Sequence, residues 1–140
     1  MRYGVRLLGP GVLLGLLVGC GSSCKPSGKV TLRGEPIAGA ELIFRPVATP
    51  DAPIIGLSGS DGAYRLDYAG KSGVPTGKCR VVVTHYTLPN GKPLPGGEEG
   101  AALKSGDKKV VRTVYSFERD LAAGASTQDF ELSEGKLGAE

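Results

Sequence analysis

Apolar residues in this chain recur at strand spacing rather than helical spacing, and this pattern constrains its fold most. No long segment carries apolar side chains three and four residues apart, as an amphipathic helix requires. Short runs alternate apolar and polar residues instead, and the 23 Gly and 10 Pro are frequent enough to place a turn between one run and the next. This pattern predicts an all-β fold of short strands joined by turns.

Several runs have the alternation of a strand with one buried face. In residues 28–33, for example, Val30 and Leu32 point to the same side. The sequence Gly59-Ser60-Asp61-Gly62 is typical of a tight hairpin turn. The expected strands are residues 28–33, 41–46, 54–60, 63–68, 78–86, 110–117 and 126–132. About seven such strands indicate an antiparallel Greek-key β-sandwich, in which Phe130 and Leu132 are buried.

A short apolar segment opens the chain and ends in a cysteine. Arg2 and Arg6 supply positive charge, and Leu7 to Val18 form an apolar run of about a dozen residues, as in a signal peptide. The run is too short to span a bilayer, which needs roughly 20 apolar residues. Leu17-Val18-Gly19-Cys20 resembles the lipobox of bacterial lipoproteins, which implies cleavage before Cys20 and acylation of Cys20 by fatty acids such as palmitate.

The lipobox resemblance also implies a location. An acylated Cys20 anchors the chain to the cell membrane or outer membrane, facing the periplasm or the exterior. Gly21 stands where an Asp would favour retention in the inner membrane, which favours the outer membrane. Two alternatives remain: an uncleaved hydrophobic N-terminus, and an ordinary secretory signal in which Cys20 is incidental. The expected segments are a signal peptide (1–19), a tether (20–27), the sandwich (28–133) and a flexible tail (134–140).

Once the signal peptide is removed, the chain is nearly neutral. The sequence has 17 Lys and Arg, of which 15 remain without Arg2 and Arg6, against 14 Asp and Glu, a net charge of +1. No basic stripe with interleaved aromatic residues is present, which argues against nucleic acid as a partner. The only basic cluster has acidic neighbours, as in a solvated loop. It consists of Lys104, Lys108, Lys109 and Arg112.

An ordered series of motifs resembles a known domain class. The motifs are Gly28-Lys29-Val30-Thr31-Leu32, Gly34-Glu35-Pro36-Ile37-Ala38-Gly39-Ala40, Ile43-Phe44-Arg45-Pro46, Ser60-Asp61-Gly62-Ala63-Tyr64-Arg65-Leu66 and Pro75-Thr76-Gly77-Lys78-Cys79-Arg80-Val81-Val82-Val83. They are similar to the carboxypeptidase regulatory-like domain, a transthyretin-like (prealbumin) β-sandwich of small bacterial envelope lipoproteins. The resemblance is strong over residues 28–85 and looser to 132. The chain departs from it at Cys79, where the family pattern usually has an aromatic residue.

Three cysteines are present, and acylation would use Cys20. Cys24 and Cys79 then form an even pair in an oxidising envelope, where disulfides persist. Cys79 shares a strand face with Val81 and Val83, so its side chain is expected to be buried. A Cys24–Cys79 disulfide and a merely buried thiol both fit this pattern.

Residues suited to enzyme chemistry are sparse. His85 is the only histidine, and we expect it at a surface or strand end, since a zinc site needs several ligands at fixed spacing. Ser58 to Gly62 lacks the base that a serine nucleophile needs and the further oxygen ligands of a calcium site. A transthyretin-like hydrolase of hydroxyisourate requires several His and Arg and a Tyr-Arg-Gly-Ser ending, whereas this chain has a single His and no such ending. We therefore predict no catalytic residue, no metal site and no cofactor.

Residues 87–108 are rich in Pro, Gly and charge, and we predict a mobile excursion there that contacts a partner.

The function expected from all these features is a lipid-anchored, non-enzymatic binding or structural module of the bacterial cell envelope. Its partners would be the membrane, through Cys20, and an envelope protein or glycan. Two alternatives are an accessory subunit that presents a strand edge to a secreted partner, and an envelope hydrolase with an unrecognised site.

Overall fold

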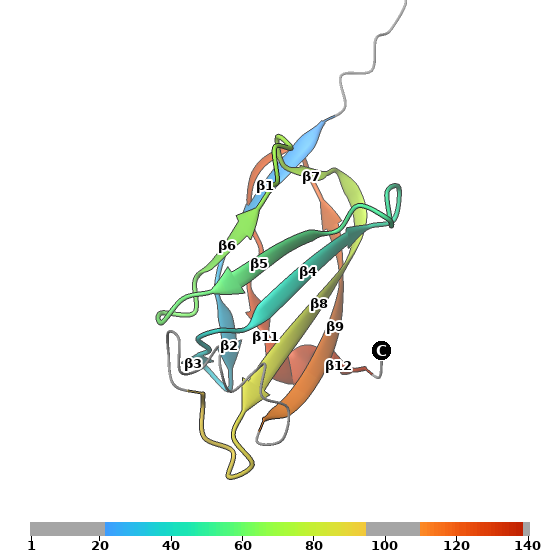
Figure 1. Ribbon diagram of the computed structural model, residues 1–140. Helices are drawn as coiled ribbons and strands as arrows, with labels where there is room; N and C mark the ends of the chain where they lie inside the picture. Colours follow the sequence, from blue (N-terminus) through green and yellow to red (C-terminus); the bar gives the residue numbers. More distant parts are fainter. Residues whose placement is uncertain (1–21, 95–109, 139–140) are drawn as a thin grey trace, which may run out of the picture.

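A computed structural model describes residues 22–94 and 110–138, and the chain in these ranges consists almost entirely of β-strands (Figure 1). Within them the only helical element is one 3₁₀ turn, η1 (Leu132–Glu134). The all-β prediction is therefore confirmed. The expected signal peptide, residues 1–19, and Cys20 lie outside the described residues.

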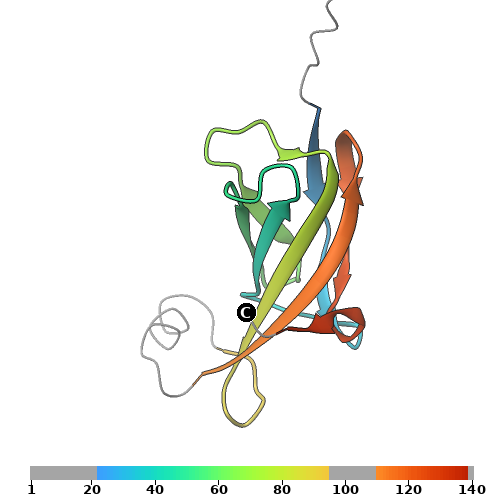
Figure 2. The ribbon, with the colours of Figure 1, turned by 90° about the vertical axis from the view of Figure 1, so that its right-hand side faces the viewer.

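The larger sheet has antiparallel strands in the order β12-β9-β8-β4-β5-β6. Its strands are β4 (Glu41–Pro46), β5 (Ile54–Ser58), β6 (Tyr64–Asp67), β8 (Gly77–Thr87), β9 (Val111–Leu121) and β12 (Lys136–Leu137). The strands β4, β5 and β6 follow one another, and β8 returns to lie beside β4. This is the Greek-key order, so that part of the prediction is confirmed. The long pair β8 and β9 runs the length of the molecule (Figure 2).

Two three-stranded sheets, in the orders β10-β1-β7 and β11-β2-β3, form the second layer. Their strands are β1 (Ser23–Ser27), β2 (Val30–Leu32), β3 (Glu35–Pro36), β7 (Val74–Pro75), β10 (Gly124–Thr127) and β11 (Phe130–Glu131). Because β1 leads into β2 and β10 leads into β11, the two sheets continue one another across the inner face of the larger sheet (Figure 1). The molecule is thus a β-sandwich, with several strands of only two residues where the sequence predicted about seven longer ones.

The first and last parts of the chain pair in parallel: β1 with β10, and β2 with β11. We call these contacts the N–C pairing. These two parallel pairs are an exception within the antiparallel sandwich that the sequence predicted. The reason is geometric, because β9 ends at the same end of the sandwich at which β1 begins, so the chain turns there and β10 runs in the direction of β1 (Figures 1 and 2).

Two boundaries expected from the sequence are also wrong. The tether predicted over residues 20–27 is a strand from Ser23 onward, in which Cys24 and Pro26 are buried. Pro26 is tolerated because β7 pairs only with Ser23 and Cys24, which leaves Pro26 with β10 alone as its neighbour. The tail expected at 134–140 begins within η1 and continues into β12, which pairs with β9; residues 139–140 lie outside the described residues.

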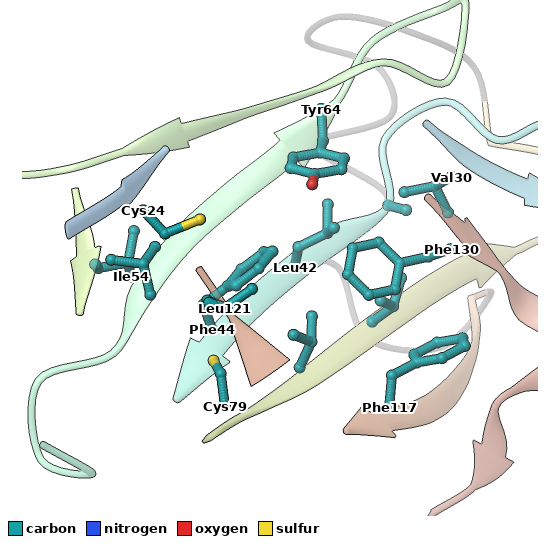
Figure 3. Packing of buried hydrophobic residues seen from close by; sticks show 14 of the residues in the cluster. Cys24, Val30, Leu42, Phe44, Ile54, Tyr64, Cys79, Phe117, Leu121 and Phe130 are labelled. Carbon is teal, nitrogen blue, oxygen red and sulfur yellow. The ribbon is translucent and has the colours of Figure 1, made fainter. Parts of the chain in front are cut away.

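Hydrophobic side chains from both layers meet in one core (Figure 3). Four aromatic rings lie at its centre, with centroid distances from 5.1 Å for Phe117–Phe130 to 6.0 Å for Phe44–Phe130, both edge-to-face. The fourth ring, Tyr64, donates its hydroxyl proton to the carbonyl of Gln128 at 2.9 Å. Phe130 and Leu132 are fully buried, as the alternation predicted.

The segment expected to leave the sandwich after β8 begins as a regular turn. The Leu88 amide donates to the Lys92 carbonyl at 2.8 Å, and the Gly91 amide donates to the Leu88 carbonyl at 2.9 Å. An isolated bridge between Thr87 and Pro93 closes this turn. Residues 88–93 therefore form a closed turn at the end of β8. Residues 95–108 of the predicted excursion lie outside the described residues.

Candidate functional site

Cys24 and Cys79 are both free and buried, so of the two arrangements that fit the sequence the structure has buried thiols and not a disulfide. Cys24 on β1 and Cys79 on β8 face the core from opposite layers (Figure 3). Burial raises the pKa of both thiols, that of Cys79 to about 11, and such thiols are poor nucleophiles at neutral pH. Burial of Cys79 itself was predicted correctly.

His85 lies on the inner face of β8, in step with Val81 and Val83, and its side chain is 8% exposed. It is two residues from the end of the strand, as expected, but the predicted surface position is wrong. Removal from water lowers the pKa of His85, because the protonated ring is the form that burial disfavours. The ring is therefore neutral at physiological pH.

The Ser58 hydroxyl both donates and accepts a hydrogen bond to the surrounding backbone. It donates to the Ile37 carbonyl at 2.6 Å and accepts from the Ala40 amide at 2.9 Å. The following hairpin turn is confirmed, with the Gly62 amide donating to the Gly59 carbonyl at 2.9 Å. These groups stabilise the turn, as the sequence predicted. In residues 22–94 and 110–138, no three His, Cys, Asp or Glu side chains come together in a way that would hold a metal ion.

Glu131 makes more hydrogen bonds than any other polar side chain in the described residues, and no local sequence pattern indicates this. Its carboxylate accepts from the Arg33 amide at 2.7 Å, the Gly34 amide at 3.1 Å and the Thr31 hydroxyl at 3.0 Å. It also accepts from the hydroxyl of Ser133 at 2.7 Å and from that residue's amide at 3.2 Å. Partial burial acts to raise the pKa of Glu131, but these hydrogen bonds outweigh it and lower the pKa to about 2.

The network around Glu131 is structural. Arg33 and Gly34 have φ of 53° and 81°, as in the two-residue turns that join β-hairpins, and Glu131 binds both of their amides. It therefore fixes the β2–β3 turn against β11 and η1. These hydrogen bonds commit the carboxylate to the fold.

One end of the sandwich gathers hydroxyl groups around the first described residue. We call it the N-terminal end and define it by Ser22 and the loops 47–53 and 68–76, which Figures 1 and 2 place at the same end as the start of β1. A cleft of about 310 Å³ opens there. It is lined by Ser22, Ser23, Thr49, Ala52, Lys71, Ser72, Gly73 and Pro75.

A second cleft, of about 440 Å³, lies near the start of β8 and has mixed charge. Lys78 lies opposite Asp120 and Arg80 lies opposite Glu118 on the paired strand β9. The neighbouring Arg119 guanidinium is 5.0 Å from the Phe130 ring centroid and donates to the Asp129 carbonyl at 3.3 Å. Three cationic and two anionic side chains line the cleft, and two of the cations, Lys78 and Arg80, lie opposite carboxylates on the paired strand.

The outer face of β5 is apolar and exposed. Ile55 and Leu57 point outward with 50% and 53% of their surface accessible. They line a shallow depression of about 380 Å³ with Glu41, Gly56, Arg65 and Asp67. Two adjacent aliphatic side chains in a charged rim form a surface suited to contact with another molecule.

The part of the chain that the structure describes includes no helix with the length and hydropathy that a membrane span requires. Comparison of the sequence and the structure with known protein families, curated proteins and solved structures finds no match.

Proposed function

We propose that this protein is a lipid-anchored, non-enzymatic β-sandwich that serves as a binding or structural module of the bacterial cell envelope. The proposal joins the lipobox-like sequence at Leu17 to Cys20 to one structural observation. Every described strand begins at or after Ser23, and the first described hydrogen bonds are made by Ser22. A chain cleaved before Cys20 therefore keeps the whole sandwich and carries its acyl chains directly at one end.

The side chains best suited to catalysis are engaged in the fold, which supports a non-enzymatic role. The Ser58 hydroxyl has two backbone partners, and the Glu131 carboxylate holds a turn. The Cys24 and Cys79 thiols and the His85 ring are buried in the core. The exposed pair Ile55 and Leu57 supports a binding role, with an envelope protein or glycan as the partner class.

The β6 edge of the larger sheet gives the strand-edge alternative little support. The edge strand of the larger sheet on this side is β6, and the Tyr64 amide at its start already donates to the Gly28 carbonyl at 3.2 Å. The remaining edge, Arg65–Asp67, is only three residues long. An added strand needs a longer run of free amides and carbonyls to bind by backbone pairing.

The anchor is tested by Triton X-114 partitioning of cells grown with a clickable fatty acid. We expect the wild-type protein to enter the detergent phase with the label, and Cys20→Ser to lose the label and leave that phase once the signal is removed. Cys24→Ala is the matched control, because it removes a cysteine four residues away and should keep the label. An unlabelled wild-type protein in the aqueous phase would refute the anchor.

A further inference from the structure

We propose that the N-terminal end of the sandwich rests against the phospholipid headgroups, so that the 310 Å³ cleft at this end faces the membrane surface. The proposed contact depends on the proposed acylation of Cys20. It replaces the tether expected over residues 20–27, and it assigns a contact surface to loops 47–53 and 68–76.

The connection between an acylated Cys20 and the folded domain is too short to hold the N-terminal end away from the lipid. The Ser22 and Thr76 hydroxyl oxygens are 2.8 Å apart, and the Thr76 amide donates to the Ser22 carbonyl at 3.3 Å. Ser22 is thus already part of the domain, and only Gly21 separates it from Cys20. Two residue steps span at most about 7 Å.

That distance matches the thickness of the headgroup layer. The difference between a whole bilayer and its hydrocarbon core corresponds to about 5–7 Å of headgroups on each side. Acyl chains in the hydrocarbon hold Cys20 at the inner boundary of this layer, so Ser22 lies no farther out than its outer boundary. The loops beside Ser22 are therefore brought into contact with lipid.

These loops are already folded into compact turns. In loop 68–76, the Lys71 amide donates to the Tyr68 carbonyl at 2.8 Å, and Ala69 and Gly70 have φ of 45° and 81°. In loop 47–53, the Ala52 amide donates to the Thr49 carbonyl at 3.1 Å. The surface therefore needs little ordering when it meets the membrane.

The chemistry of the cleft suits a zwitterionic lipid surface. Ser22, Ser23, Thr49 and Ser72 bring hydroxyl groups, which hydrogen-bond to phosphate and ester oxygens. Lys71 is the only charged residue that lines the cleft, and Asp51 is the only other charged residue in loops 47–53 and 68–76, so the two loops together have no net charge. Contact therefore requires no anionic lipid.

The opposite end of the molecule supplies the control position. Asn90 lies in the turn after β8, and β8 is 11 residues long, so about 35 Å separates this turn from the N-terminal end (Figure 1). Asn90 and Ser72 are both exposed, whereas the native Cys24 and Cys79 are buried, so an introduced cysteine at either site can be labelled selectively.

The test uses acylated Ser72→Cys and Asn90→Cys proteins, each carrying a thiol-linked fluorophore, in phosphatidylcholine vesicles that contain a headgroup nitroxide lipid. We expect the nitroxide to quench the label at position 72 by roughly twofold or more and to leave the label at position 90 unchanged, because only position 72 lies within the headgroup layer. Flotation of the same vesicles reports the anchor separately. Protein that floats but shows equal quenching at both positions overturns the contact alone, and protein that does not float overturns the anchor and the contact with it.

Discussion

At the scale of single residues, Glu131 connects positions 97 to 100 residues apart in the sequence. We expect Glu131→Gln to lower the free energy of unfolding at pH 7, because an amide replaces one acceptor oxygen with a group that cannot accept. Water weakens each bond to this partly exposed carboxylate, so the loss should be about 1 kcal/mol. Urea unfolding measures it. Glu35→Gln, which removes the same charge from exposed β3, is the control and should be near neutral.

The pH dependence of this effect has a definite sign. The pKa of Glu131 falls from 4.5 to about 2 on folding, so its stabilisation is complete above pH 4.5 and disappears as the pH falls towards 2. The difference between wild type and Glu131→Gln should therefore shrink over that window. A difference that stays constant from pH 7 to pH 2 would mean that the charge of Glu131 does not stabilise the fold.

Substitution of two glycines by alanine distinguishes the cost of a positive φ from the cost of a steric clash. Gly34 and Gly62 have φ of 81° and 79°, but a Cβ at Gly34 would meet nothing within 4 Å, whereas one at Gly62 would lie 2.7 Å from the Val30 carbonyl oxygen. We expect Gly34→Ala to cost about 1 kcal/mol for its φ alone and Gly62→Ala to cost clearly more. Chemical denaturation of the two variants provides the comparison. Equal losses would indicate that the contact at Gly62 relaxes freely.

The cysteines provide a prediction about reactivity. Because burial removes both thiols from solvent and raises their pKa values, iodoacetamide should modify Cys24 and Cys79 slowly in the native protein and rapidly in denaturant. Mass spectrometry of the non-reduced protein counts the modified sites. Two thiols that stay unmodified in denaturant would show that a disulfide forms after all.

At the scale of elements, β1 is the strand whose removal should matter most. It is the central strand of its sheet, so without it β7 and β10 lose their only strand neighbour in that sheet. We expect a soluble chain that starts at Gly28 to have a Tm more than about 10 °C lower than one that starts at Ser22, or not to fold. Removing Cys20 and Gly21 alone should leave the Tm unchanged. If the chain that starts at Gly28 keeps its Tm, residues 23–27 are a tether.

The elements also show what sequence reasoning recovers. β4 and the hairpin of β5 and β6 were predicted closely, because alternation and turn residues are local signals. β1 was missed because small polar residues and a proline conceal an inward pair, Cys24 and Pro26. The Glu131 network and the N-terminal end could not be predicted, since each depends on pairings between distant segments that no local pattern encodes.

At the scale of the whole molecule, the sandwich is elongated, and the proposed membrane contact and the exposed apolar pair lie in different places on it. The N-terminal end lies at one tip, and the turn at residues 88–93 lies at the other (Figure 1). The exposed pair Ile55 and Leu57 lies on the outer face of β5, between these ends. With the N-terminal end at the lipid, this face stands roughly upright above the membrane, open to a partner that approaches from the side.

The N–C pairing determines when such a molecule can finish folding. A chain exported from its N-terminus delivers β1 first and β10 and β11 near the end, so β1 lacks its β10 partner until nearly the whole sequence has crossed the membrane. Contacts between residues about 100 positions apart also form slowly, because closing so long a loop costs conformational entropy. If Cys20 is acylated before β10 and β11 have crossed the membrane, these two strands must return to the bilayer surface to pair with β1 and β2. Maturation would then end where the lipid is attached.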